Sequence, residues 1–218
     1  MNAPKHLIRR VIEIDYRHKH RHAPGSLSAL PIICGIFECM QPDDVFILSK
    51  GHACAALYAV LENRGLKPRV ELVHPERDPE NGVTITSGSL GHGLPVGVGI
   101  AHARKLAGRP SQVHVLMGDG ECLEGTTWEA LHLAHRLRLH ERQPHGGRFW
   151  LMAHVDANGL QGADYLLDDT CERISSIYPG VRIHFGLPGS GVPFFEGTDQ
   201  SVHQITDAEF AAIMEGLQ

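Results

Sequence analysis

The chain has 218 residues, of which 42% are hydrophobic and 21% charged, with a formal net charge of -5 at pH 7. These proportions are typical of one soluble globular α/β domain. Basic residues form no long block, which excludes an obvious surface for nucleic acid or an anionic membrane. The longest apolar run, 29–37, is far short of the roughly 20 residues that span a bilayer. We expect a cytoplasmic protein with a small-molecule or protein partner.

The first half of the chain predicts helices that alternate with one buried strand. Apolar spacing indicates helices at 6–17, 26–37 and 53–62, and the β-branched run 43–49 is typical of a buried parallel strand. A strand is expected at 83–86, before a helix that ends near Gly108. That helix contains three glycines, each costing about 1 kcal/mol relative to alanine, so a close approach to its backbone is expected.

The second half predicts three more strands, at 112–117, 149–155 and 181–185. Thr126 and Glu129 have the spacing of a capping box that starts a helix, and Thr206 and Glu209 repeat it before a helix at 207–217. Strands alternating with helices predict a doubly wound, mainly parallel sheet with helices on both faces. We expect a single domain over 1–218.

Polar turns follow two of the predicted strands, where a sheet of this kind binds its ligand. Asp119 lies between Gly118 and Gly120, and Asn158 precedes Gly159. A carboxylate and an amide supply hard oxygen ligands that suit Mg²⁺ or Ca²⁺ better than zinc, and Mg²⁺ commonly shares its coordination sphere with phosphate. Glycines let backbone amides approach an anion. A GDG turn after a strand is often only a tight turn; its pairing with the second turn favours a diphosphate site.

The chain resembles the N-terminal domain of transketolases and the first subunit of split transketolases, which depend on thiamine diphosphate (ThDP). Matching segments in order are HAPGSLSA (22–29), SKGHA (49–53), HPE (74–76), SGSLGHGLPVGVGIA (87–101), GDGECLEG (118–125), DANGLQG (156–162) and SVHQ (201–204). They extend over almost the whole chain. Between 163 and 188 the chain looks shortened, as though a helix and a strand were lost.

The resemblance implies roles for particular residues. It implies that Asp119, Asn158 and the carbonyl of Leu160 hold the metal that grips the ThDP diphosphate. The other implied cofactor contacts are His52, Gly88, Leu90, Gly118, Gly120 and Glu124.

Four histidines match family positions around the thiazolium ring and the sugar hydroxyls: His22, His52, His74 and His203. Imidazole can donate or accept a proton near neutral pH, which suits this task. Glu124 matches an acidic position at the contact with the pyrimidine-binding domain, and Glu129 is a weaker match because of its expected capping role. Lys50 fits the split-subunit pattern, with a surface lysine at a helix start as the alternative.

In this family a second domain carries the glutamate that activates ThDP through its pyrimidine ring. We expect a separate partner subunit with that domain, in an α2β2 heterotetramer, and transfer of a two-carbon ketol unit from a ketose or ketose phosphate to an aldehyde. Two alternatives stay open. One is a related ThDP subunit for 2-oxoacid decarboxylating acyl transfer, of the E1 or deoxyxylulose phosphate synthase kind. The other is a non-catalytic stabilising subunit.

Overall fold

The computed structural model describes residues 3–144, 147–160, 167–197 and 202–217. Its centre is a parallel sheet of four strands in the order β1-β2-β3-β4. The strands are β1 (Val45–Leu48), β2 (Val113–Gly118), β3 (Leu151–Asp156) and β4 (Val181–His184). In this register Gly118 lies opposite Asp156, and Asp156 lies opposite His184. The carboxyl ends of β2, β3 and β4 therefore lie level at one edge of the sheet.

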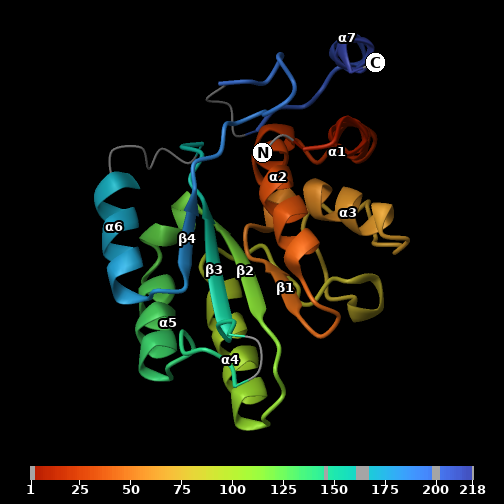
Figure 1. Ribbon diagram of the computed structural model, residues 1–218. Helices are drawn as coiled ribbons and strands as arrows, with labels where there is room; N and C mark the ends of the chain where they lie inside the picture. Colours follow the sequence, from red (N-terminus) through yellow and green to blue (C-terminus); the bar gives the residue numbers. More distant parts are fainter. Residues whose placement is uncertain (1–2, 145–146, 161–166, 198–201, 218) are drawn as a thin grey trace.

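Helices cover both faces of the sheet (Figure 1). Parallel neighbours need a crossover connection, and α4 (Gly93–Leu106), α5 (Gly125–Arg136) and α6 (Leu167–Ile177) precede β2, β3 and β4 on one face. The other face carries α1 (Lys5–His18), α2 (Ala23–Cys39) and α3 (Cys54–Asn63), and α7 (Asp207–Gly216) packs beside α1. The predicted fold class, a parallel α/β sheet with helices on both faces, is confirmed.

Each face of the sheet packs into its own hydrophobic core. On β2, Val113, Val115 and Met117 join the core beneath α4 and α5, whereas Leu116 joins the core formed by α1, α2 and α3. Strand side chains alternate between faces, so His114 lies on the α2 side with Leu116. Both faces of β2 are buried along its whole length, as expected for a central parallel strand.

The described residues also form three short 3₁₀ turns: η1 (Gly51–Ala53), η2 (Pro79–Asn81) and η3 (Asp119–Leu123). Both η1 and η3 directly follow a strand or its polar turn, so they bend the chain at the carboxyl edge of the sheet. No helix in the described part of the chain is long and apolar enough to cross a membrane.

Two local expectations were wrong, and one helix was not expected. The strand expected at 83–86 does not form, because Val83 pairs only with Asp78 in an isolated bridge and Thr84 hydrogen-bonds to Phe46 of β1. The Thr126 hydroxyl donates to the carbonyl of Gly91 at 3.0 Å, so it does not cap α5, which begins at Gly125. Helix α6 was not predicted.

Other expectations on the C-terminal part have mixed outcomes. The second capping box is confirmed, since Thr206 accepts from the Glu209 amide at the start of α7. The shortening expected at 163–188 stays a prediction, and within that range 163–166 lie outside the described residues, as do 161–162 and Ser201 of the matching segments.

Candidate active site

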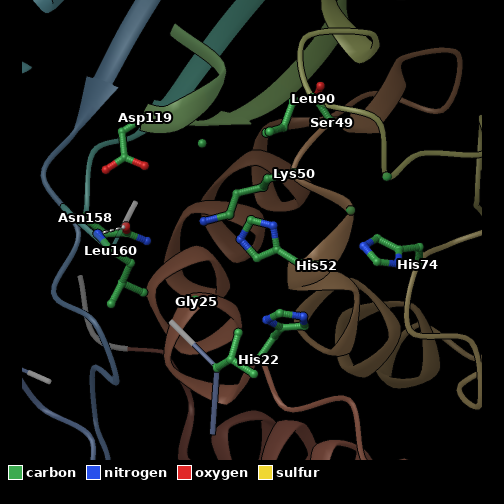
Figure 2. A pocket seen from close by; sticks show the side chains of 14 residues that line it. His22, Gly25, Ser49, Lys50, His52, His74, Leu90, Asp119, Asn158 and Leu160 are labelled. Carbon is green, nitrogen blue, oxygen red and sulfur yellow. Dashed lines mark hydrogen bonds between the residues drawn. The ribbon is translucent and has the colours of Figure 1, made fainter. Parts of the chain in front are cut away.

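A cavity of about 320 Å³ opens at the carboxyl edge of the sheet, above β2 and β3. It collects side chains from segments far apart in sequence: the start of α2, the turn after β1, the loop before α4 and the turns after β2 and β3 (Figure 2). Its lining is His22, Gly25, Ser49, Lys50, Gly51, His52, His74, Gly88, Leu90, Gly118, Asp119, Asn158, Leu160 and Val202. Most of the site residues expected from the sequence therefore share one cavity.

Asp119 and Asn158 lie on the same side of this cavity (Figure 2). The Asp119 carboxylate, which is 2% exposed, accepts from the amides of Gly120 at 2.9 Å and Gly159 at 2.7 Å. The Asn158 side chain donates to Ser28 at 3.1 Å and its Oδ1 accepts from the Leu160 amide at 3.1 Å. These bonds tie the turn after β3 to the turn after β2, and they fix the two oxygen donors at neighbouring strand ends.

The chemistry of these donors fits a hard divalent cation. Each carboxylate oxygen of Asp119 accepts one hydrogen bond and keeps capacity for another contact. Among the described residues no group of three His, Cys, Asp or Glu side chains converges as a metal site. A cation here would have to rely on one carboxylate, an amide oxygen and a carbonyl, which is the donor set that Mg²⁺ and Ca²⁺ accept and zinc disfavours.

A buried ion pair lies beside the cavity. The Lys50 ammonium lies 2.5 Å from Asp156 Oδ2, and the two side chains are 1% and 0% exposed. Asp156 also accepts from the Ser28 hydroxyl at 2.6 Å and from Asn158 Nδ2 at 3.3 Å. Lys50 is therefore a buried cation, and the alternative of a surface lysine is wrong. Its charge is balanced locally by Asp156.

A buried glutamate holds the loop before α4 against the end of β2. Glu121 is fully buried and accepts from the amides of Gly91 at 3.0 Å and Gly118 at 2.9 Å, and from the Ser49 hydroxyl. Burial raises the pKa of this carboxyl, and the three hydrogen bonds oppose that shift. The loop that carries Gly88 and Leu90 is thereby anchored to the turn that carries Asp119.

The histidines His22, His52 and His74 line the part of the cavity away from Asp119 (Figure 2). The rings of His22 and His52 have centroids 5.4 Å apart. Burial, reinforced by the charge of Lys50, lowers the pKa of His52 to about 2, so this imidazole is neutral and can donate or accept one hydrogen bond. Gly88 has φ +147°, a backbone conformation that favours glycine, and a Cβ there would lie 3.2 Å from the His74 ring, which would have to shift slightly.

Three of the expected site residues lie outside the cavity lining. Gly120 uses its amide on Asp119. Glu124 precedes α5, half-buried against Gly91. The His203 ring contacts Phe194 and Phe195 and lies 3.2 Å from Glu209, while its amide donates to Arg21 beside His22. Their roles stay predictions.

Several lining residues were not assigned to the site from sequence. Gly25, Ser49, Lys50, Gly51 and Val202 line the cavity, and Asp156 lies outside the lining, paired with Lys50. Ser49, Lys50 and Gly51 belong to the segment that contains His52, so that segment was the available signal. Asp156 opens the turn that contains Asn158, but as the last residue of a strand it carried no separate signal.

The fold and the cavity define a class of protein: a parallel α/β domain with a cavity at the carboxyl ends of two central strands, where such folds bind their ligands, with hard oxygen donors on one side and imidazoles on the other.

Comparison with known proteins identifies the family. The family model for the thiamine diphosphate binding domain of transketolase matches residues 39–143. One subunit of the apulose-4-phosphate transketolase from Phocaeicola vulgatus is 34% identical over 190 residues, covering 78% of this chain and 62% of that protein. A transketolase family protein of Sinorhizobium fredii is 32% identical over 196 residues, covering 72% of this chain and 69% of that protein. The chain belongs to the transketolase family, and its match is to the ThDP-binding domain.

A solved transketolase mutant from Pichia stipitis has the same fold, with a TM-score of 0.80 at 22% identity. The likeness covers 98% of this chain and 40% of that chain. The described structure thus corresponds to about two fifths of a full-length transketolase.

Proposed function

We propose that this chain is the diphosphate- and metal-binding subunit of a two-component transketolase. Such an enzyme transfers a two-carbon ketol unit from a ketose or ketose phosphate to an aldehyde. The observation that supports it most directly is the cavity itself, where Asp119 and Asn158 lie at adjacent strand ends opposite His22, His52 and His74. The family match indicates ThDP as the cofactor, and this arrangement suits both the diphosphate of ThDP and a hydroxylated substrate.

The cation in this proposal is Mg²⁺ or Ca²⁺, held by the Asp119 carboxylate, the Asn158 amide oxygen and the Leu160 carbonyl. The amides around Gly118 and Gly120, together with His52, face the diphosphate. Gly88 and Leu90 lie beside the rings of the cofactor. When bound, ThDP supplies the carbanion chemistry of ketol transfer. The residues of this chain would hold the cation that balances the charge of the diphosphate, orient the cofactor and exclude water.

The three cavity histidines handle the substrate hydroxyls in this proposal. His52 is neutral because burial lowers its pKa, so it can hydrogen-bond a hydroxyl without adding charge. His22 and His74 flank it from two other elements, which allows contacts with more than one hydroxyl. A group near a breaking carbon–carbon bond must accept a hydroxyl proton, and in this proposal that step belongs to His22 or His74, because the lowered pKa makes His52 a weak base. We place His203 and Glu124 at the periphery of the site, Glu124 toward the partner subunit.

A partner subunit is part of the proposal. The Phocaeicola vulgatus relative is named as one subunit of a transketolase, and a second relative, from a Clostridium species, is named 6-deoxy-6-sulfo-D-fructose transketolase subunit SqwG. Those names support a partner chain. We propose that this partner carries the pyrimidine-binding domain and assembles with this chain as α2β2. They also support small sugars or sugar phosphates as substrates.

The test is metal-dependent cofactor binding by an Asp119→Ala variant. We expect ThDP affinity measured by calorimetry with Mg²⁺ to fall more than tenfold, because a carboxylate ligand is lost. Asp169→Ala is the matched control, since Asp169 lies on α6 with its side chain 73% exposed and should bind normally. Ketol transfer, assayed with the chain's own partner, should be lost in the first variant alone. Unchanged, Mg²⁺-dependent ThDP binding by Asp119→Ala would overturn the proposal.

A further inference from the structure

A second cavity, of about 550 Å³, lies between α2 and the strands β2, β3 and β4. None of its lining residues lines the cofactor cavity. Helix α2 supplies one wall, the sheet supplies the floor, and the segment after β4 supplies the rim. The lining is Ser28, Pro31, Ile32, Gly35, Ile36, Cys39, His114, His154, His184, Phe185, Gly186, Leu187 and Ser190. Its volume lies within the range of about 300–1,000 Å³ that small-molecule sites have.

Three histidines cross the floor of this cavity as a hydrogen-bonded row. His114 Nδ1 lies 3.1 Å from His154 Nε2, and His154 Nδ1 lies 3.0 Å from His184 Nε2. Ring centroids are 5.4 and 5.3 Å apart, with interplanar angles of 25° and 24°. Because the ring centroids are more than 5 Å apart while the facing nitrogens are about 3 Å apart, neighbouring rings meet edge to edge through an N–H···N hydrogen bond. They do not lie face to face. Each step moves one strand across the sheet and toward its carboxyl edge.

The row has a direction that follows from its buried end. His114 Nε2 is buried and has no hydrogen-bond partner among the described residues. Buried N–H groups without a partner are rarer in proteins than unsatisfied acceptors, so the proton of His114 belongs on Nδ1. His154 then receives that proton bond on Nε2 and donates from Nδ1 to His184. The Nδ1–H of His184 remains as the donor at the outer end of the row.

The cavity carries no formal charge. None of its lining residues is Asp, Glu, Lys or Arg. Burial lowers the pKa of His114 to about 4 and that of His154 to about 2, and it also lowers the pKa of His184, so the row is neutral at pH 7. Among the charged groups outside the lining that act on the row are Arg182, which donates to the backbone carbonyls of Pro179 and Val181, and Asp156, which is paired with Lys50. A charged ligand would lose its hydration here without a counter-ion in the lining, which is unfavourable. The site therefore selects against charged molecules.

The remaining lining is apolar. Ile32 and Ile36 of α2 are buried, while Phe185 is 76% and Leu187 is 48% exposed at the rim. Large side chains this exposed leave apolar surface that a bound molecule could cover. An apolar wall with a few converging polar groups is the usual form of a small-molecule site.

We propose that this cavity binds an uncharged, ring-sized apolar molecule that carries one hydrogen-bond acceptor, which faces His184. The site has a direct link to the cofactor cavity. The Ser28 hydroxyl lines the second cavity, donates to Asp156 at 2.6 Å and accepts from Asn158 at 3.1 Å. Resting on the proposed function, a ligand that moves Ser28 would also change metal and ThDP affinity.

The test uses acetophenone, an uncharged aromatic ketone, on the full chain together with any partner that co-purifies. Histidine ring signals are followed by NMR, without ThDP or metal, so the outcome does not depend on the proposed function. We expect saturable shifts of the His184 and His154 signals, assigned with His184→Gln and His154→Gln. Benzoate and benzylammonium should shift them at least tenfold more weakly. Absence of a saturable shift, or equal binding of either charged probe, would overturn the proposal.

A pair of variants locates the binding. Leu187→Trp places an indole at the rim of the cavity and should weaken acetophenone binding at least tenfold. Leu106→Trp is the matched control, because Leu106 is 75% exposed at the end of α4 and does not line the cavity. Equal affinities in the two variants would show that the probe binds elsewhere and would reject this site.

Discussion

Replacing Lys50 with methionine should show how strongly the candidate active site depends on its buried ion pair. The variant keeps a flexible apolar chain but removes the cation that lies 2.5 Å from Asp156, and both side chains are at most 1% exposed. Removing one partner of a buried ion pair costs about 3–5 kcal/mol, because the other charge is left buried and unpaired. Asp156 keeps its hydrogen bonds from Ser28 and Asn158, so we expect a loss near the lower value.

The assay is urea unfolding followed by circular dichroism at pH 7. With a urea dependence of about 2 kcal/mol per molar, a loss of about 3 kcal/mol lowers the unfolding midpoint by roughly 1.5 M. Arg69→Met is the control, because Arg69 and Glu76 form a pair whose side chains are 45% and 55% exposed. Such a pair contributes less than about 1 kcal/mol. The double variant Lys50→Met with Asp156→Asn should recover part of the loss. If Lys50→Met lowers the midpoint no more than Arg69→Met, the reasoning about the buried pair is refuted.

Three further substitutions test single features. Burial raises the pKa of Asp15 to about 6, so its protonated form stabilises the folded state at low pH and this contribution is lost as the pH rises. The free energy of unfolding should therefore fall by about 2–3 kcal/mol between pH 4 and pH 7 through this group. Asp15→Asn should remove that fall, measured by urea midpoints at both pH values. Gly91→Ala places a Cβ 2.4 Å from the Thr126 hydroxyl at φ +73° and should lower the free energy of unfolding by about 2–4 kcal/mol. Gly108→Ala, at φ +60° in open space, should lower it by about 1–2 kcal/mol. Melting temperatures of the two variants test this difference. Glu121→Gln turns an NH₂ group toward a backbone N–H donor and should lower the free energy of unfolding in urea by about 1–3 kcal/mol. Unchanged stability would show that the carboxylate is not needed.

The carboxyl edge of the sheet could be predicted because its signals are local. The apolar runs that became β2 and β3 are followed at once by Asp119 and Asn158, and parallel strands bring such turns together. The strand expected at 83–86 failed for a tertiary reason: Thr84 uses its hydroxyl on β1, and this short apolar stretch has no strand partner beyond one bridge. Propensity alone cannot supply a neighbour.

Pairings across long sequence separations could not be predicted. Lys50 matches the split-subunit pattern, but a surface lysine stays an alternative until Asp156, 106 positions later, is known to lie beside it. The row formed by His114, His154 and His184 depends on the register of three strands. Each histidine occurs within a predicted strand, so a polar residue in an apolar run was visible, but the sequence does not show which of them meet.

The separation of the two cores by the sheet has a consequence for backbone exchange with solvent. Because β2 and β3 are enclosed on both faces, their amide hydrogens should exchange with deuterium only when the whole domain opens. Gly120 and Gly159, whose amides donate to Asp119, lie within three residues of the ends of those strands. The turns that carry Asp119 and Asn158 are thus attached to the slowest-exchanging part of the backbone, whereas the loop before α4 is held by side-chain bonds from Glu121, Thr126 and Thr84. We therefore expect the amides of that loop to exchange faster than those of the two turns.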